Sequence, residues 1–97
     1  MIQSLAHVKV SLPSFFSQYT SGERVLEIDA TTLNDVINTL IEKYGDRFKK
    51  RILESDGRLN RFINIYINGK NSRLLGGLTI TLKDGDRIDI LPAVAGG

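Results

Sequence analysis

The chemistry that this sequence could perform is concentrated in its last residues, Leu91-Pro92-Ala93-Val94-Ala95-Gly96-Gly97. Glycine has no side chain and tolerates most backbone conformations, so a Gly-Gly end is thin enough to enter a narrow channel in another protein. Residues 93–97 reach at most about 17 Å when extended. An α-carboxyl group has an ordinary pKa of about 3.3–3.7, so Gly97 is an anion at neutral pH and attracts no nucleophile until it is activated. This ending predicts a substrate whose terminal carboxylate is activated by another protein.

The rest of the sequence lacks the residues that would activate a carboxyl group. It contains no glycine loop with a lysine for cradling phosphates, no cysteine and a single histidine. His7 stands without a nucleophile or a metal-ligand pattern, so we expect a solvent-facing or hydrogen-bonded histidine and not a catalyst. The chain is therefore expected to be a co-substrate and not an enzyme, with no metal site and no bound cofactor.

Length and charge narrow the class of protein. At 97 residues the chain suits one domain, and 13 Lys and Arg against 11 Asp and Glu leave a formal net charge of +2. This surplus is too small to predict a nucleic-acid partner. Residues 1–5 do not resemble a signal peptide, and no later stretch is long and apolar enough for a membrane span. A cytoplasmic protein with no membrane partner is expected.

Alternating apolar and polar residues predict the strands. Apolar residues occupy every second position from Ala6 to Leu12, and Asn68-Gly69 is typical of a tight turn after a strand. Pro92 has no N–H for a strand ladder, so the last strand should end near Leu91. The first two strands are close enough to form an antiparallel hairpin. The predicted strands cover residues 6–12, 24–28, 62–67 and 87–91, with a short edge strand at 73–75.

An amphipathic helix is predicted between the second and third strands. Its apolar stripe, at spacings of three and four, is Leu33, Val36, Ile37, Leu40, Ile41 and Tyr44. Thr31 or Thr32 can cap its start, and Gly45 fits its end. A further irregular or helical turn is expected at 46–53. Its basic residues are interpreted as a solvated face, with an acidic partner as the alternative; they are Arg47, Lys49, Lys50 and Arg51.

This order of elements predicts an α+β roll, with a mixed sheet of about four to five strands and one main helix packed on one face. It is the order of the β-grasp, or ubiquitin-like, fold, in which the final strand commonly lies beside the first. Phe15, Phe16 and Tyr19 are expected to cap one end of the core, with a binding surface as the alternative. We expect a β-grasp domain over residues 1–92 and a flexible tail over residues 93–97.

Three segments at matching separations also resemble one protein family. They are Arg61-Phe62-Ile63-Asn64-Ile65-Tyr66-Ile67-Asn68, Asp84-Gly85-Asp86 and Ile90-Leu91-Pro92-Ala93-Val94-Ala95-Gly96-Gly97. With the β-grasp order they are similar to the MoaD/ThiS family of ubiquitin-like sulfur carriers over essentially the whole chain. The similarity is greatest to the carriers that feed sulfur into cysteine synthesis.

The resemblance implies a reaction sequence at Gly97. An activating enzyme would adenylate Gly97 with ATP, and sulfur would then replace AMP to leave a thiocarboxylate. The acceptor would be a pyridoxal-phosphate cysteine synthase, with a metalloprotease later freeing cysteine, or the large subunit of molybdopterin synthase. The small subunit of molybdopterin synthase and a thiamine sulfur carrier stay open as alternatives because their tails are similar.

Two further functions are compatible with the same ending. In a protein modifier of the ubiquitin type, the activated Gly97 would be joined to lysines of other proteins. In a plain β-grasp interaction domain, Gly96 and Gly97 would have no role. Isopeptide-linked Gly97 would favour the modifier, and an unaltered function after removal of both glycines would favour the interaction domain.

Partners are expected to bind both the tail and the folded body. Ordering five tail residues costs about 1–2 kcal/mol each, which tail contacts alone do not readily recover. The tail residues expected at the interface are Ala93, Val94, Ala95, Gly96 and Gly97. On the body, Phe62, Tyr66 and Leu91 are candidates because they should lie on the sheet face away from the helix, with burial in the core as the alternative.

Overall fold

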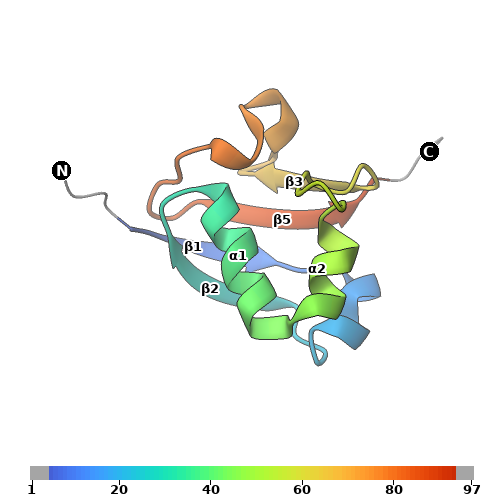
Figure 1. Ribbon diagram of the computed structural model, residues 1–97. Helices are drawn as coiled ribbons and strands as arrows, with labels where there is room; N and C mark the ends of the chain where they lie inside the picture. Colours follow the sequence, from blue (N-terminus) through green and yellow to red (C-terminus); the bar gives the residue numbers. More distant parts are fainter. Residues whose placement is uncertain (1–4, 94–97) are drawn as a thin grey trace.

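The computed structural model describes residues 5–93 and shows a five-stranded mixed sheet with two helices over one face (Figure 1). The strand order is β2-β1-β5-β3-β4, so the final strand lies beside the first. This confirms the predicted α+β roll with a β-grasp, ubiquitin-like arrangement. The strands are β1 (Ala6–Ser11), β2 (Val25–Ala30), β3 (Ile63–Ile67), β4 (Lys70–Asn71) and β5 (Arg87–Pro92). The helices are α1 (Leu33–Tyr44) and α2 (Asp46–Ile52), and the 3₁₀ turns are η1 (Ser14–Tyr19), η2 (Ser72–Leu74) and η3 (Gly77–Thr79).

Strand pairing places β5 between two neighbours. β1 and β2 form the predicted antiparallel hairpin, and β1 runs parallel to β5 from the pair Lys9↔Arg87 to Ser11↔Asp89. β3 runs antiparallel to β5 from Ile67↔Ile88 to Ile63↔Pro92. Beyond Asp89, β5 therefore pairs with β3 alone, and the last residues of the strand are fixed by that one neighbour.

The core lies between the sheet and the helices. Every second residue of β1 and β3 is buried, and so are Ile88 and Ile90 of β5, as the alternation predicted; Val10, Ile65 and Ile90 are fully buried. The apolar stripe of α1 packs against these side chains. Thr32 begins α1 with a capping box, in which Asp35 N–H donates to Thr32 Oγ1 at 3.2 Å and Thr32 N–H donates to Asp35 Oδ2 at 3.1 Å. Thr32 is thus the cap of the two threonines that the sequence offered.

The segment after α1 is helical, as α2, and it packs against the aromatic residues of η1. Phe16 of η1 is fully buried, and its ring centroid lies 5.3 Å from that of Phe48 on α2, so it closes one end of the core as expected. Phe15 remains 42% exposed. The guanidinium groups of Arg47 and Arg51 lie 5.5 and 5.4 Å from the centre of the Tyr19 ring. Part of the basic run therefore covers an aromatic side chain of this domain.

The predicted edge strand at 73–75 is wrong. The edge strand is β4, only two residues long, which follows a tight turn at Asn68 and Gly69 with φ values of 51° and 86°. Asn71 Oδ1 accepts a hydrogen bond from Arg73 N–H at 3.0 Å, and this local bond turns the chain into η2. Residues 73–75 therefore leave the sheet edge.

Candidate functional site

The candidate site is the place where β5 ends and the tail begins. The ladder extends past its predicted end near Leu91, because Pro92 still pairs with Ile63 and Ala93 N–H donates to Phe62 O at 2.7 Å. Successive N–H groups of a strand point to opposite neighbours. Because Ala93 N–H points to β3, the backbone nitrogen of Pro92 points to the side of β1, where the pairing has already ended, and its missing N–H breaks no bond. The chain is held by the sheet up to Ala93.

Four of the predicted site residues, Val94, Ala95, Gly96 and Gly97, lie outside the described residues. The activation of Gly97 and the contacts of the other three stay predictions. The tail boundary proposed at residue 93 also stays a prediction, and Ala93 is the last residue that the structure describes.

Exposed apolar side chains surround this point on the sheet face away from the helices. Phe62 is 61% exposed and Leu91 is 45% exposed, so burial in the core is wrong for both. Leu91 lies opposite Asn64 in the register, and Tyr66 lies opposite Asp89 on the same face. Tyr66 is half-buried. The structure thus brings Phe62 and Leu91 beside Ala93, and their binding to a partner stays a prediction.

The turn before β3 is braced by Arg73, which the sequence did not single out. Its Nη2 donates to Asn60 O at 3.0 Å and to Ile63 O at 2.7 Å, and its Nε donates to Asn64 Oδ1 at 3.3 Å. A planar guanidinium can make such bonds to several oxygens at once. No periodicity in the sequence signals this role, because the contacts join η2 to a segment about ten residues earlier. Arg73 fixes the start of the strand that carries the base of the tail.

Phe62 is held in its exposed position by its neighbours. Its N–H donates to Asn60 Oδ1 at 2.8 Å, and the Arg61 guanidinium lies 5.7 Å from the centre of its ring. Arg61 in turn donates its N–H to Glu54 Oε2 at 3.0 Å. The backbone that carries this aromatic side chain is therefore fixed by hydrogen bonds before any partner arrives.

The other end of the open sheet face is charged. His7 Nδ1 lies 2.7 Å from Asp29 Oδ1, and its Nε2 contacts Glu27 Oε1. The hydrogen bond to Glu27, followed by that to Asp29, raises the pKa of His7, and the same bond to His7 lowers the pKa of Glu27. This confirms a hydrogen-bonded, exposed histidine. Within residues 5–93, no group of three or more His, Asp or Glu residues is arranged to hold a metal ion.

The described part of the chain therefore offers a rigid base for a tail and an exposed apolar surface beside it. Among the residues that the structure describes, no helix is both long and apolar enough to span a membrane. An arrangement of this kind can present a chain end to a partner and be recognised through its body.

Comparisons with known proteins agree with this geometry. The model of the ThiS family matches residues 12–97. The sulfur carrier protein CysO of Mycobacterium tuberculosis is 40% identical over 93 residues, which cover 94% of this chain and 99% of CysO. A chain of the crystal structure of the Amycolatopsis orientalis BexX/CysO complex matches with a TM-score of 0.81 and 39% identity, over 93% of this chain and 99% of that chain. The solution structure of small archaeal modifier protein 1 from Methanosarcina acetivorans matches with a TM-score of 0.79 and 38% identity, over 96% of this chain and 98% of that chain.

Proposed function

Because the chain belongs to the ThiS family, we propose that it is a sulfur carrier whose Gly97 carboxyl group is converted to a thiocarboxylate. The observation that carries this proposal is the family match over residues 12–97, which includes the Gly-Gly end. The protein would act as a co-substrate of other enzymes and not as an enzyme itself. We further propose that it works in the cytoplasm, where ATP for its activation is available.

The proposed chemistry needs an activating enzyme and ATP. A carboxylate oxygen of Gly97 attacks the α-phosphorus of ATP, and pyrophosphate leaves. The resulting mixed anhydride has a good leaving group, so a sulfur nucleophile supplied by the activating system can add at the carbonyl carbon and expel AMP. Gly97 has no side chain to obstruct this attack. The product is a tethered sulfur nucleophile that an acceptor enzyme can position, where free sulfide would be dilute.

Cysteine synthesis is the favoured destination of the sulfur, because the chain is similar to CysO over nearly its full length. The acceptor would then be a pyridoxal-phosphate enzyme that forms cysteine on the carrier, and a metalloprotease would release it. The large subunit of molybdopterin synthase is the alternative acceptor. A role as a protein modifier is the second candidate function, and the similarity to small archaeal modifier protein 1 favours it.

The exposed pair Phe62 and Leu91 is proposed as the body surface that these partners bind. Both side chains lie beside Ala93, so a partner that receives the tail also reaches them. A peptide of residues 91–97 should therefore be a poor substrate for the activating enzyme. Equal turnover of peptide and full chain would contradict this part of the proposal.

Mass spectrometry after incubation with the activating enzyme, ATP and a sulfur source tests the function directly. The expected result is a mass increase at Gly97 that corresponds to the replacement of one oxygen by sulfur. A chain extended by one alanine after Gly97 is the matched control and should not be charged. Unchanged Gly97 under conditions that charge a known sulfur carrier would refute the sulfur-carrier proposal, whereas isopeptide-linked Gly97 in cells without thiocarboxylate would favour the modifier.

A further inference from the structure

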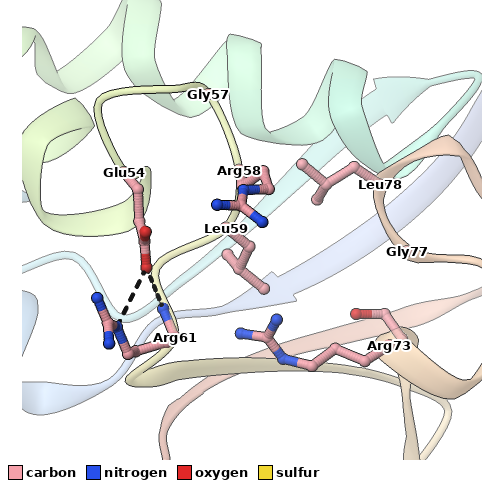
Figure 2. A pocket seen from close by; sticks show the side chains of 9 residues that line it. Glu54, Gly57, Arg58, Leu59, Arg61, Arg73, Gly77 and Leu78 are labelled. Carbon is pink, nitrogen blue, oxygen red and sulfur yellow. Dashed lines mark hydrogen bonds and ion pairs between the residues drawn. The ribbon is translucent and has the colours of Figure 1, made fainter.

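A pocket of about 680 Å³ lies between the loop that precedes β3 and the η2–η3 segment (Figure 2). Three arginines line it, Arg58, Arg61 and Arg73, together with the carboxylate of Glu54 and the apolar side chains of Leu59 and Leu78. Figure 2 shows the guanidinium groups of Arg58 and Arg73 on either side of Leu59. The pocket therefore joins positive charge to an apolar wall.

The arginines of this pocket are incompletely neutralised. Arg58 pairs through Nε with Asp56 at 2.8 Å, and Arg61 pairs through Nε with Glu54 at 3.6 Å. Arg73 donates to two backbone carbonyls and an amide oxygen, none of which carries a charge. Arg58 and Arg61 also keep 80% and 76% of their side-chain surface exposed. Among the described residues, these three guanidinium groups thus face two carboxylates, and one positive charge is left over for an incoming anion.

Ser72 supplies a second, independent sign of a missing polar partner. Its residue surface is only 1% exposed, and it lines the same pocket next to Arg73. Among the described residues, its Oγ has no hydrogen-bond partner. A buried hydroxyl without a partner is unfavourable. Its Oγ has almost no accessible surface, so an acceptor oxygen in the pocket would reach it only after a local shift of Ser72.

The pocket borders the base of the tail. Arg61 immediately precedes Phe62, whose carbonyl accepts the hydrogen bond of Ala93 N–H. Arg73 donates to Ile63 O, and Ile63 pairs with Pro92, the last residue of β5. A group bound in the pocket therefore lies near Pro92 and Ala93, from which the predicted tail would continue.

We propose that this pocket binds a carboxylate side chain that the partner protein presents when it takes up the tail. Guanidinium groups pair with carboxylates through two parallel hydrogen bonds, which suits Arg58 and Arg61. Leu59 and Leu78 fit an apolar residue beside the acidic one, whereas a free inorganic anion would leave this wall in water. The inference rests on the proposed function, because it assigns a contact to the partners that handle Gly97.

Binding to a short acidic peptide tests the pocket without the partner. The full chain, labelled with ¹⁵N, is titrated with acetyl-Leu-Glu-Glu-Leu-amide, with the matching Gln-Gln peptide and with inorganic phosphate. The acidic peptide should shift the signals of Arg58, Arg61, Ser72 and Gly77, and the Gln-Gln peptide should not. Equal shifts with both peptides, shifts with phosphate as large as with the acidic peptide, or no shifts at these residues would overturn the proposal.

Arginine variants make the test specific to this pocket. R58Q and R61Q should each weaken acidic-peptide binding at least about threefold, the loss expected for one partly exposed ion pair. R87Q is the matched control, because Arg87 also pairs through Nε with a carboxylate two residues away, Asp89 at 3.1 Å, and does not line the pocket. An equal loss in R87Q would mean that the peptide responds to net charge and would overturn the proposal.

The charging reaction separates this inference from the proposed function. With an activating enzyme that charges the wild-type chain, R58Q and R61Q should raise KM for the carrier at least about threefold with little change in kcat, because the contact forms before the chemistry. Wild-type KM in both variants would refute the docking site and leave the sulfur-carrier function standing. Failure to charge the wild-type chain would instead refute the proposed function.

Discussion

The replacement Arg73→Met should weaken the base of the tail. Methionine keeps an unbranched apolar stem but loses the three donors to Asn60 O, Ile63 O and Asn64 Oδ1. The bond to Ile63 O is partly buried and should contribute about 1 kcal/mol, and the two exposed bonds about 0.5 kcal/mol together. We therefore expect a loss of about 1.5 kcal/mol in the free energy of unfolding and a decrease of about 6–12 °C in Tm.

Chemical denaturation measures the global effect of this change, and hydrogen exchange measures the local one. Ile63 N–H donates to Asn60 O at 3.0 Å, the carbonyl that also accepts from Arg73. The Ile63 amide should therefore exchange about tenfold faster in the variant. Arg87→Met is the control, since its surface pair with Asp89 should contribute less than about 0.5 kcal/mol.

Three results would refute the brace that we assign to Arg73. The first is a stability of Arg73→Met within about 0.5 kcal/mol of wild type, which is the range of an ordinary surface substitution. The second is an equal loss in Arg87→Met, since the effect would then reflect the removal of positive charge. Full recovery by Arg73→Lys would also contradict it, because lysine cannot reach three oxygens with a planar fork.

Two more predictions concern the sheet face and α1. His7→Gln should lower stability most between about pH 4.5 and about pH 6.5, where His7 and Glu27 are both charged. The pKa of His7 is raised, so the stabilisation by the pair is lost as pH rises through the pKa of His7 in the folded protein. The pKa of Glu27 is lowered, so the stabilisation is also lost as pH falls through the pKa of Glu27 in the folded protein. Denaturation of both proteins at about pH 5.5 and about pH 8.5 checks this, and an equal stability difference at the two pH values would contradict it. Thr32→Ala should cost about 1 kcal/mol by removing the capping box, while Thr32→Ser should cost little; equal unfolding midpoints for the two variants would contradict the cap.

The fold was predictable because strand and helix periods persist over several residues. Alternation located β1, β3 and β5, and the stripe of α1 was marked by a threonine cap and by Gly45. The segment at 73–75 was mispredicted as a strand because its direction depends on a side-chain bond from Asn71 and on contacts of Arg73 with β3. Such tertiary contacts override local propensity and leave no periodic signal.

The candidate site was predictable in part. Strand parity placed Phe62 and Leu91 on the face away from the helices, but it could not decide whether that face was covered. The pocket beside the tail was missed because its arginines are separated along the sequence by up to fifteen positions, from Arg58 to Arg73. Only the fold of the loop against η2 and η3 brings them together.

The structure also gives a reason for a carrier to have a folded body. Ala93 is already held by its bond to Phe62 O, so ordering residues 94–97 in a partner would cost about 4–8 kcal/mol at about 1–2 kcal/mol per residue. Covering Phe62 and Leu91, which are partly buried already, should return about 2–3 kcal/mol, and two ion pairs in the arginine pocket about 1–2 kcal/mol. Together these contacts would offset a large share of the ordering cost, and both lie close to Ala93, the base of the predicted tail. A partner that used them would recognise the body first, because the body is already ordered, and would then meet the tail at a high effective concentration.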